Sequence, residues 1–518
     1  MRDNTLSVRQ PAPNVPHVWL GVFALFFSVS CAQIYPFSGN QNTYFVHAMI
    51  LANWGELSRD WLASTLSSIP YFDHLLAWAF QFMGVGSFYA LYILLMALSA
   101  FCLGGIVLYV FPLHHHPLRL LIWFVAVQFV FSSVFAKAMM VIFKTALPQH
   151  LFISGEAWQI VFTSSLEPAT FGLGLVMAIY LFLINRYYLA VFAAILSCTL
   201  HTGILLATVW LLGAFFWILW RDGWGWQRLG RLSLFSGLLS LPVLIYVLLY
   251  FSPTSAEISK RARQIIAFEF LPYHADSHMW LGWDTLFRFC LVICAIFLVA
   301  RQRVLRSILL IPLLLAVVGT VVQYLTRDSF LGLLFPWRIS SVLVPMATVL
   351  ILAWILVRLP EPPPLSHPAG KAGMAVLFLL AFFLSGSGIY RTISSYDQGE
   401  HSDESGAMKH MRDHWDKESV YLVPIDMLRA RLYSGMPVYV DGKGHPFRDQ
   451  DFLQWWERVH RVRAFYAGLT ANSCFSAQEV SKAFGVSHVI VPVATGLVCP
   501  GQVESYRDSH YVIYKIKT

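Results

Sequence analysis

The sequence predicts a polytopic α-helical membrane protein of about eleven transmembrane helices, followed by a small α/β domain. Two observations lead to this fold class. The 518-residue chain is 57% hydrophobic and only 12% charged, whereas soluble globular chains carry about 25% charged residues. Apolar runs of about 18 to 25 residues also recur along the chain, and each is long enough to cross a hydrocarbon core of about 30 Å.

The apolar runs set the expected elements. The predicted transmembrane helices are 17–37, 87–111, 118–143, 167–185, 187–200, 202–220, 232–252, 284–301, 306–325, 338–357 and 373–391. We interpret 187–220 as a tight helical hairpin, because this stretch is too long for one upright helix and short for two. Residues 1–16 are expected to be a polar tail before an uncleaved first helix.

Basic residues predict the orientation, because cytoplasmic loops near the membrane retain positive charge. With the N-terminus in the cytoplasm, the inner side receives Arg2, Arg9, Arg119, Arg186, Arg221, Arg228, Arg231, Arg301, Arg303, Arg306, Arg358 and Lys371. This predicts a cytoplasmic tail at 1–16, a transmembrane domain at 17–391 with an outer loop at 38–86, and an extracytoplasmic domain at 392–518. Ten or twelve spans would break the alternation and put the C-terminal domain in the cytoplasm.

Residues 392–518 carry most of the acidic residues and no apolar span. Strand-like segments at 420–423, 438–440 and 488–491 alternate with helix-like segments at 405–416, 448–467 and 477–484, which predicts a small α/β domain. Cys474 and Cys499 are its two cysteines. A disulfide between them would suit an oxidising compartment, and two free thiols are the alternative.

Several basic residues fall on the predicted outer side, against the general bias. They are Lys260, Arg261, Arg263, Arg327 and Arg338. An arginine binds phosphate through a forked pair of hydrogen bonds, and a lysine adds a mobile charge. We therefore expect these residues to hold a lipid-linked phosphate; the alternative is that they reach ordinary lipid headgroups.

Glu167 and His201 are predicted at the same membrane face. A carboxylate and an imidazole there are candidates for handling protons or for orienting a sugar hydroxyl. Glu167 also precedes Pro168, a pattern typical of a helix start, and His201 has the alternative role of a packed turn residue.

Other chemistry has little support in the sequence. The cluster His114, His115 and His116 is joined by no cysteine or carboxylate, so no metal site is predicted. Phosphate-loop, hydrolase-elbow and zinc-protease motifs are missing from the sequence. The net charge of +8 comes largely from inner-loop arginines and does not predict nucleic-acid binding. No cofactor is predicted, and the sequence leaves a divalent cation open.

The outer loop after the first span carries three short motifs in order. These are Asn40-Gln41-Asn42-Thr43-Tyr44, then Arg59-Asp60-Trp61, then Tyr71-Phe72-Asp73. The loop resembles that of GT-C-type glycosyltransferases, in which aminoarabinose and protein O-mannosyl transferases carry Asp-Glu-x-x-Tyr, Gly-Asp-Trp and Tyr-Phe-Glu. The predicted architecture, with a long outer first loop and an outer C-terminal domain, is similar as well.

The resemblance implies transfer of a sugar from a polyprenyl phosphate to an outer-face glycan, lipid or protein, in the cytoplasmic membrane of a bacterium. A loop carboxylate would act as base or orient the acceptor, and basic groups would hold the departing phosphate. Asn40, Gln41 and Tyr44 would contact substrate. Since Asn40 and Gln41 replace the family's acids and cannot take a proton, the base is expected at Asp60, Glu167 or Asp73, with His201 as a further catalytic candidate.

Alternatives remain for each part of this hypothesis. Asp60 would face water if its segment lies at the membrane surface with Trp61 as anchor, and Asn40 and Gln41 would be turn residues beside Gly39. Segment 441–445 either borders the cavity or forms a solvated turn, and the turn is favoured. The rival functions are a polysaccharide polymerase or ligase, a non-catalytic glycan-lipid binding protein, and a transporter.

Overall fold

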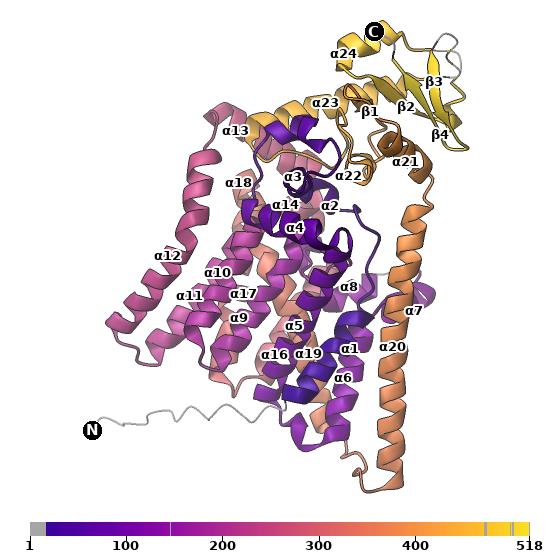
Figure 1. Ribbon diagram of the computed structural model, residues 1–518. Helices are drawn as coiled ribbons and strands as arrows, with labels where there is room; N and C mark the ends of the chain where they lie inside the picture. Colours follow the sequence, from indigo (N-terminus) through magenta and orange to yellow (C-terminus); the bar gives the residue numbers. More distant parts are fainter. Residues whose placement is uncertain (1–16, 146, 471–473, 498, 500–501, 517–518) are drawn as a thin grey trace.

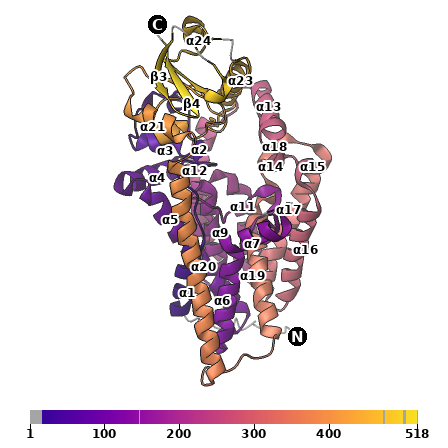
Figure 2. The same ribbon diagram turned by 90° about the vertical axis from the view of Figure 1, so that its right-hand side faces the viewer.

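The computed structural model describes residues 17–145, 147–470, 474–497, 499 and 502–516 (Figure 1). The expected cytoplasmic tail at 1–16, with Arg2 and Arg9, lies outside the described residues. The described chain forms a long body of helices with a small C-terminal domain at one end, and Figure 2 shows the same two parts from the side.

Every predicted span overlaps at least one helix. The helices are α1 (His17–Ser30), α5 (Gly86–Val110), α6 (Pro117–Phe131) with α7 (Ser133–Phe143), α9 (Leu173–Leu183), α10 (Tyr187–Leu200), α11 (Leu205–Arg221), α12 (Trp226–Tyr250), α16 (Trp283–Leu298), α17 (Arg303–Thr326), α19 (Ser340–Arg358) and α20 (Pro368–Glu400). Among the described residues, six helices are long and apolar enough to cross a membrane, or seven if the bent pair α6 and α7 is one span. The chain is therefore an integral membrane protein, and eleven spans remains a prediction.

The third predicted span is broken at one residue. Ser132 adopts an extended backbone between α6 and α7, and its hydroxyl accepts a hydrogen bond from the Phe135 amide, which begins α7. The two helices are bent by 61°. A capping serine therefore converts one long apolar run into a helix and a tilted second piece.

The outer loop predicted at 38–86 folds into short helices over the ends of the long ones (Figure 1). They are α2 (Gln41–Tyr44), α3 (Val46–Leu51), the 3-10 turns η1 (Leu57–Arg59) and η2 (Trp61–Ser64), and α4 (Pro70–Met83). Pro70 occupies the first turn of α4, where its fixed φ suits a helix start. Further short elements are η3 (Leu113–His115), α8 (Leu147–Ile153), η4 (Glu156–Trp158), η5 (Pro168–Gly172), η6 (Thr202–Ile204), α13 (Ala256–Ile265), η7 (Ile266–Phe270), α14 (Pro272–Ala275), α15 (Ser277–Trp280), α18 (Ser329–Leu333) and η8 (Pro336–Ile339).

The C-terminal domain is α/β, as predicted. Its helices are α21 (Ser405–Asp413), α22 (Ala430–Ser434), α23 (Asp449–Ala467) and α24 (Ala477–Phe484), with a 3-10 turn η9 (Val493–Thr495). In the described part, a four-stranded sheet has the order β1-β2-β4-β3, made by β1 (Tyr421–Leu422), β2 (His488–Pro492), β3 (Val503–Arg507) and β4 (Tyr511–Lys515). β1 runs parallel to β2, and β4 runs antiparallel to both β2 and β3.

Two details of this domain bear on the predictions. The segment expected as a strand at 438–440 forms a single bridge, between Val438 and Tyr421, and the hairpin of β3 and β4 was not predicted because β3 is largely exposed and lacks an apolar alternation. A disulfide joins Cys474 and Cys499, with Cα atoms 5.1 Å apart. This is the pairing that the cysteine count suggested.

The outer loop and the C-terminal domain interlock. Trp54 Nε1 donates to the carbonyl oxygen of Leu432 (2.8 Å), and the Glu56 amide donates to that of Gly435 (2.7 Å). Gly55 has a positive φ of 57°, and a Cβ there would collide with the backbone of Gly435. Only glycine satisfies both demands, so the two segments form one layer over the helix ends.

Candidate functional site

A cavity of about 520 Å³ lies beneath the layer formed by the outer loop and the C-terminal domain. This volume is in the usual range for small-molecule sites. Its lining comes from α2, the turns on either side of η5 and η6, helix α12, the segment from η7 to α14, η8, and residues 443–447 of the C-terminal domain. Segments that are far apart in the sequence therefore meet at one site.

One wall of the cavity is apolar. It is formed by Leu205 at the start of α11, by Val243, Leu244 and Val247 of α12, and by Leu271. Leu248, the next residue of α12, is 71% exposed on the surface of the helix body. A thin apolar wall of this kind is suited to a hydrocarbon chain that enters from the lipid.

Arg338 is a cation of the polar part of the lining. Its Nε donates to Gln159 Oε1 (2.6 Å), one Nη donates to His201 Nε2 (3.1 Å), and the guanidinium lies 4.5 Å from the centre of the Phe335 ring. Among the described residues, no carboxylate pairs with it. Its charge is therefore held in place but not neutralised, as a site for an anion requires.

His201 completes the arginine's surroundings. It has an extended backbone between α10 and η6, which turns its ring toward Arg338. Because Nε2 accepts from Arg338, the proton of a neutral ring is on Nδ1, and this buried atom has no hydrogen-bond partner in the described part of the chain. Tyr44 lies edge-on to the ring, with the centroids 6.0 Å apart. His201 thus holds the arginine and keeps one N–H unused.

Gly203 allows this close packing. A Cβ on Gly203 would overlap an Nη of Arg338 and would lie 3.0 Å from His201 Nε2. Gly203→Ala is therefore expected to displace the Arg338 side chain and to lower the activity of the site by about 10- to 100-fold, since small misplacements of a site residue have effects of this size.

Gly213→Ala is the matched control for this prediction, because nothing lies within 4 Å of its added Cβ. Activity is measured for both variants at equal protein level in membranes. Equal activity of the two would show that the arginine does not depend on this contact.

Gln159, the other partner of Arg338, is positioned by a strained turn. Ala157 and Trp158 have positive φ values of 53° and 58°, a conformation that costs about 1–3 kcal/mol per residue. Glu156 anchors the turn through an ion pair with the buried Arg288 (3.1 Å). Strain that is held by buried contacts is typical of functional sites.

Glu167 brings a carboxylate to the motif that begins at Asn40. Asn40 Nδ2 donates to Glu167 Oε2 (2.9 Å), and Ser165 donates to Oε1 (3.2 Å). Glu167 precedes η5 as its N-cap, with Pro168 in the first turn. The expected capping role and the position in the cavity are therefore both present. The acid therefore lies against Asn40.

The Glu167 carboxyl lies outside the apolar helix that follows it, and burial changes its pKa. Burial raises the pKa of Glu167, while the hydrogen bond from Asn40 and the charge of Lys443 act to lower it. The phenol of Tyr44 is also buried, which raises its pKa, and it interacts electrostatically with Arg338 and Glu167. A carboxylate whose pKa is raised above its ordinary value is a stronger base when it is ionised.

The C-terminal domain contributes Lys443, His445 and Phe447 to the lining. Burial lowers the pKa of the Lys443 ammonium. Burial also lowers the pKa of His445 to about 4, so this ring is neutral at pH 7 and packs against Phe270 and Phe447. Phe447 stacks on Tyr44, with centroids 5.7 Å apart.

The structure brings together some of the residues predicted from the sequence. Asn40, Tyr44, Glu167, His201 and Arg338 all line the cavity. Gln41 lies behind it: its side chain accepts from the Phe37 amide (2.6 Å) and donates to the Leu166 carbonyl (2.9 Å).

Other predicted residues lie away from the lining. Asp60 is buried in an ion pair with Arg431 (2.8 Å) and does not face water as the alternative required. Arg327 pairs with Asp276 (2.6 Å), and Arg263 donates to Ser259 (2.6 Å). Lys260 and Arg261 are exposed on α13. Of the predicted outer-side cations in the described chain, Arg338 alone is in the lining.

Some lining residues with polar side chains were not predicted from the sequence, among them Gln159 and His274. Gln159 and His274 carry no local motif, and His274 bonds the carbonyl of Ala157 (2.7 Å). Lys443 lies in the turn that was weighed as a possible border of the cavity. In the described part of the chain, no group of three or more histidine, cysteine, aspartate or glutamate side chains is placed to hold a metal ion.

A second cavity, of about 470 Å³, adjoins the first at Ile160, which lines both. Its lining carries many polar side chains, among them Gln33, Gln149, His150, Ser395 and Arg391. Two cavities that share the lining residue Ile160 give space for two molecules.

Comparison with known proteins gave three findings. Residues 402–462 match a family described as a domain of unknown function (DUF6798); no curated protein matches the chain. Among solved structures, ArnT from Cupriavidus metallidurans bound to undecaprenyl phosphate is 13% identical, with 96% of this chain and 97% of that chain covered and a TM-score of 0.45. The same ArnT in the apo state is 12% identical, with the same coverage and TM-score.

Proposed function

We propose that the chain is a membrane glycosyltransferase that moves a sugar from a polyprenyl phosphate to an acceptor on the outer face of a bacterial cytoplasmic membrane. One observation carries the proposal. A carboxylate, Glu167, and an arginine without a carboxylate partner among the described residues, Arg338, line one cavity that also has apolar lining residues. Acid, cation and apolar wall are the three features that a lipid-phosphate sugar requires.

The reaction follows from these positions. The acceptor hydroxyl attacks the anomeric carbon of the sugar, and its proton passes to the carboxylate of Glu167. The bond from the anomeric carbon to the phosphate oxygen breaks, and the phosphate leaves with the electron pair. Arg338 stabilises the negative charge that develops on the phosphate. Attack on the face opposite the phosphate inverts the configuration at the anomeric carbon.

The remaining parts of the cavity have matching roles. The polyprenyl chain lies against Val243 and Val247 of α12, where the wall is apolar. Gln159 and His201 hold the arginine. The acceptor occupies the second cavity, whose polar lining suits a hydroxyl-rich molecule, and meets the donor near Ile160. The basic inner loops favour a cytoplasmic N-terminus and a C-terminal domain outside.

Deletion of the gene is expected to remove one sugar from the cell-surface glycans, lipids or proteins and to let the polyprenyl-phosphate form of that sugar accumulate, because transfer stops while donor synthesis continues. Mass spectrometry of surface material and of the lipid-linked pool measures both changes, and the wild-type gene should reverse them. Unchanged pools and unchanged surface material would contradict the proposed function. Accumulation of whole repeat units on the carrier would indicate a polymerase or ligase.

A further inference from the structure

The turn that carries Lys443 is fixed to the outer loop. Thr43 Oγ1, in α2, donates to the carbonyl oxygen of Lys443 (2.8 Å). Two residues on, the His445 ring packs against Phe270 at the cavity wall. A Cβ on Gly444 would lie 3.2 Å from the Asn42 carbonyl oxygen. The turn at 441–445 therefore packs tightly against the motif that begins at Asn40.

Asp441 shapes this turn with one carboxylate oxygen. Its Oδ1 accepts hydrogen bonds from the backbone amides of Lys443 (2.8 Å) and Gly444 (2.5 Å). Its carbonyl oxygen accepts from Trp455 Nε1 (3.2 Å), and the Gly442 amide donates to the Ile425 carbonyl (2.9 Å). The Asp441 side chain therefore fixes the backbone at Lys443, and this turn is not a solvated loop.

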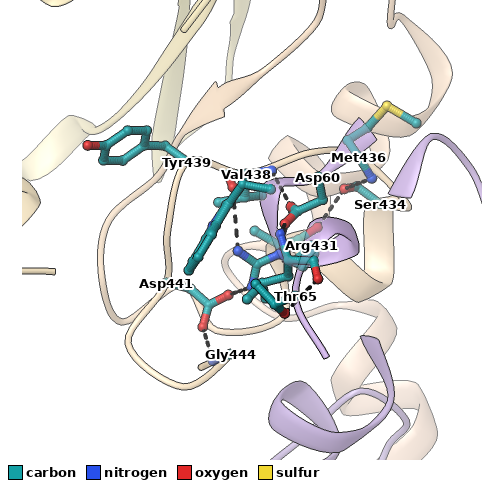
Figure 3. Close-up of polar contacts among 12 residues, drawn as sticks. Asp60, Thr65, Arg431, Ser434, Met436, Val438, Tyr439, Asp441 and Gly444 are labelled. Carbon is teal, nitrogen blue, oxygen red and sulfur yellow. Dashed lines mark hydrogen bonds and ion pairs between the residues drawn. The ribbon is translucent and has the colours of Figure 1, made fainter. Parts of the chain in front are cut away.

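The other oxygen of Asp441 belongs to a buried cluster of three charges (Figure 3). Arg431 pairs with Asp441 Oδ2 through one Nη and with Asp60 Oδ2 through Nε (2.8 Å). Asp60 Oδ2 also accepts from the Val438 amide (2.9 Å), and its Oδ1 accepts from the Leu62 amide. The side chains of all three charged residues are at most 1% exposed. We call Asp60, Arg431 and Asp441 the buried charge cluster.

Burial of charges is costly, and a buried ion pair is weak evidence for a role in stability alone. Here the cluster links the outer loop, through Asp60, to the turn of the C-terminal domain, through Asp441. The ammonium of Lys443 lies in the cavity lining, where it interacts electrostatically with Glu167. Within the described chain it makes no hydrogen bond or ion pair with a side chain. A lysine whose backbone is fixed, and whose ammonium lines a cavity without an ion-pair partner among the described residues, is suited to bind an anion.

We propose that Lys443 is a second phosphate-binding residue, supplied to the cavity by the C-terminal domain, and that the buried charge cluster positions it. This deepens the proposed function, on which it rests. Arg338 binds the phosphate from the membrane side, and Lys443 from the outer side. Asp441 and Arg431 do not touch the substrate; they are positioning residues.

The test is the affinity of the purified full-length protein for undecaprenyl phosphate, used as the probe. Lys443→Ala should weaken binding by about 10- to 100-fold, the usual effect of removing one charged contact, and Lys443→Arg should restore most of it. Lys482→Ala, at an exposed lysine of the same domain, should bind like the wild type. Equal binding by Lys443→Ala and Lys482→Ala would overturn the assignment.

The positioning role is tested by a double-mutant cycle. Asp441→Asn should weaken binding in the wild-type background and have little further effect when Lys443 is already alanine, because coupled residues are not additive. An equal loss in both backgrounds would show that Asp441 is merely structural. If the wild type itself does not bind the probe, the proposed function fails. If it binds, and Arg338→Ala weakens binding while Lys443→Ala does not, only this inference fails.

Discussion

Replacement of Glu167 by glutamine is expected to reduce sugar transfer by about 10²- to 10⁴-fold, the range for loss of a general base. Glutamine keeps the size of the side chain and still accepts from Asn40 and Ser165 through one oxygen, but it cannot take the acceptor proton. Transfer is measured in the deletion strain carrying the variant, as the fraction of surface material that bears the sugar. Affinity for undecaprenyl phosphate should change little.

Glu257→Gln is the matched control for Glu167→Gln. Glu257 is an exposed carboxylate in the first turn of α13, outside the cavity lining, so its replacement tests loss of charge alone. If Glu167→Gln transfers the sugar as well as Glu257→Gln does, Glu167 is not the base. That result would favour a protein that binds the lipid-linked sugar without transferring it.

The pH dependence of transfer follows from the same carboxylate. Burial raises the pKa of Glu167, and the Asn40 hydrogen bond and the Lys443 charge act to lower it. The base works when it is ionised, so activity falls as the pH drops below this pKa. Asn40→Ala removes a donor that stabilises the ionised form, and the acid side of the pH–rate profile should therefore move to higher pH. A shift to lower pH would contradict the assignment.

Arg338→Ala is expected to reduce transfer by about 10²- to 10³-fold, since removal of one electrostatic contact to a developing charge has this effect. Among the described residues that line the cavity, Arg338 is the one arginine. Arg338→Lys keeps the charge but loses the bond to Gln159 or the bond to His201, because a lysine has no planar fork. Its activity should lie between those of the wild type and Arg338→Ala.

The sequence predicted the helices and part of the site because both have local signals. Apolar length located each long helix, and the break at Ser132 was missed because a serine cap inside an apolar run leaves hydropathy almost unchanged. Glu167 and Arg338 were found because an ionisable residue at the edge of an apolar run is unusual.

The rest depended on contacts between distant segments. Asp60 was a candidate base from its motif, but its partner Arg431 lies 371 residues further along the chain. Lys443 reaches the cavity because the C-terminal domain is fixed to the outer loop by the Asp60 ion pair and by Thr43. No local pattern reveals such pairing. Conversely, Lys260 and Arg261 were expected to hold the phosphate, but they are exposed and are not among the lining residues.

The central claim is that this cavity binds a polyprenyl phosphate through Arg338. Binding of undecaprenyl phosphate to the purified protein, measured by native mass spectrometry, tests it most directly, with Arg261→Ala as control because Arg261 is an exposed arginine outside the lining. We expect the wild type and Arg261→Ala to bind equally, and Arg338→Ala to bind about 10- to 100-fold more weakly. No binding by the wild type, or equal binding by all three proteins, would contradict the account.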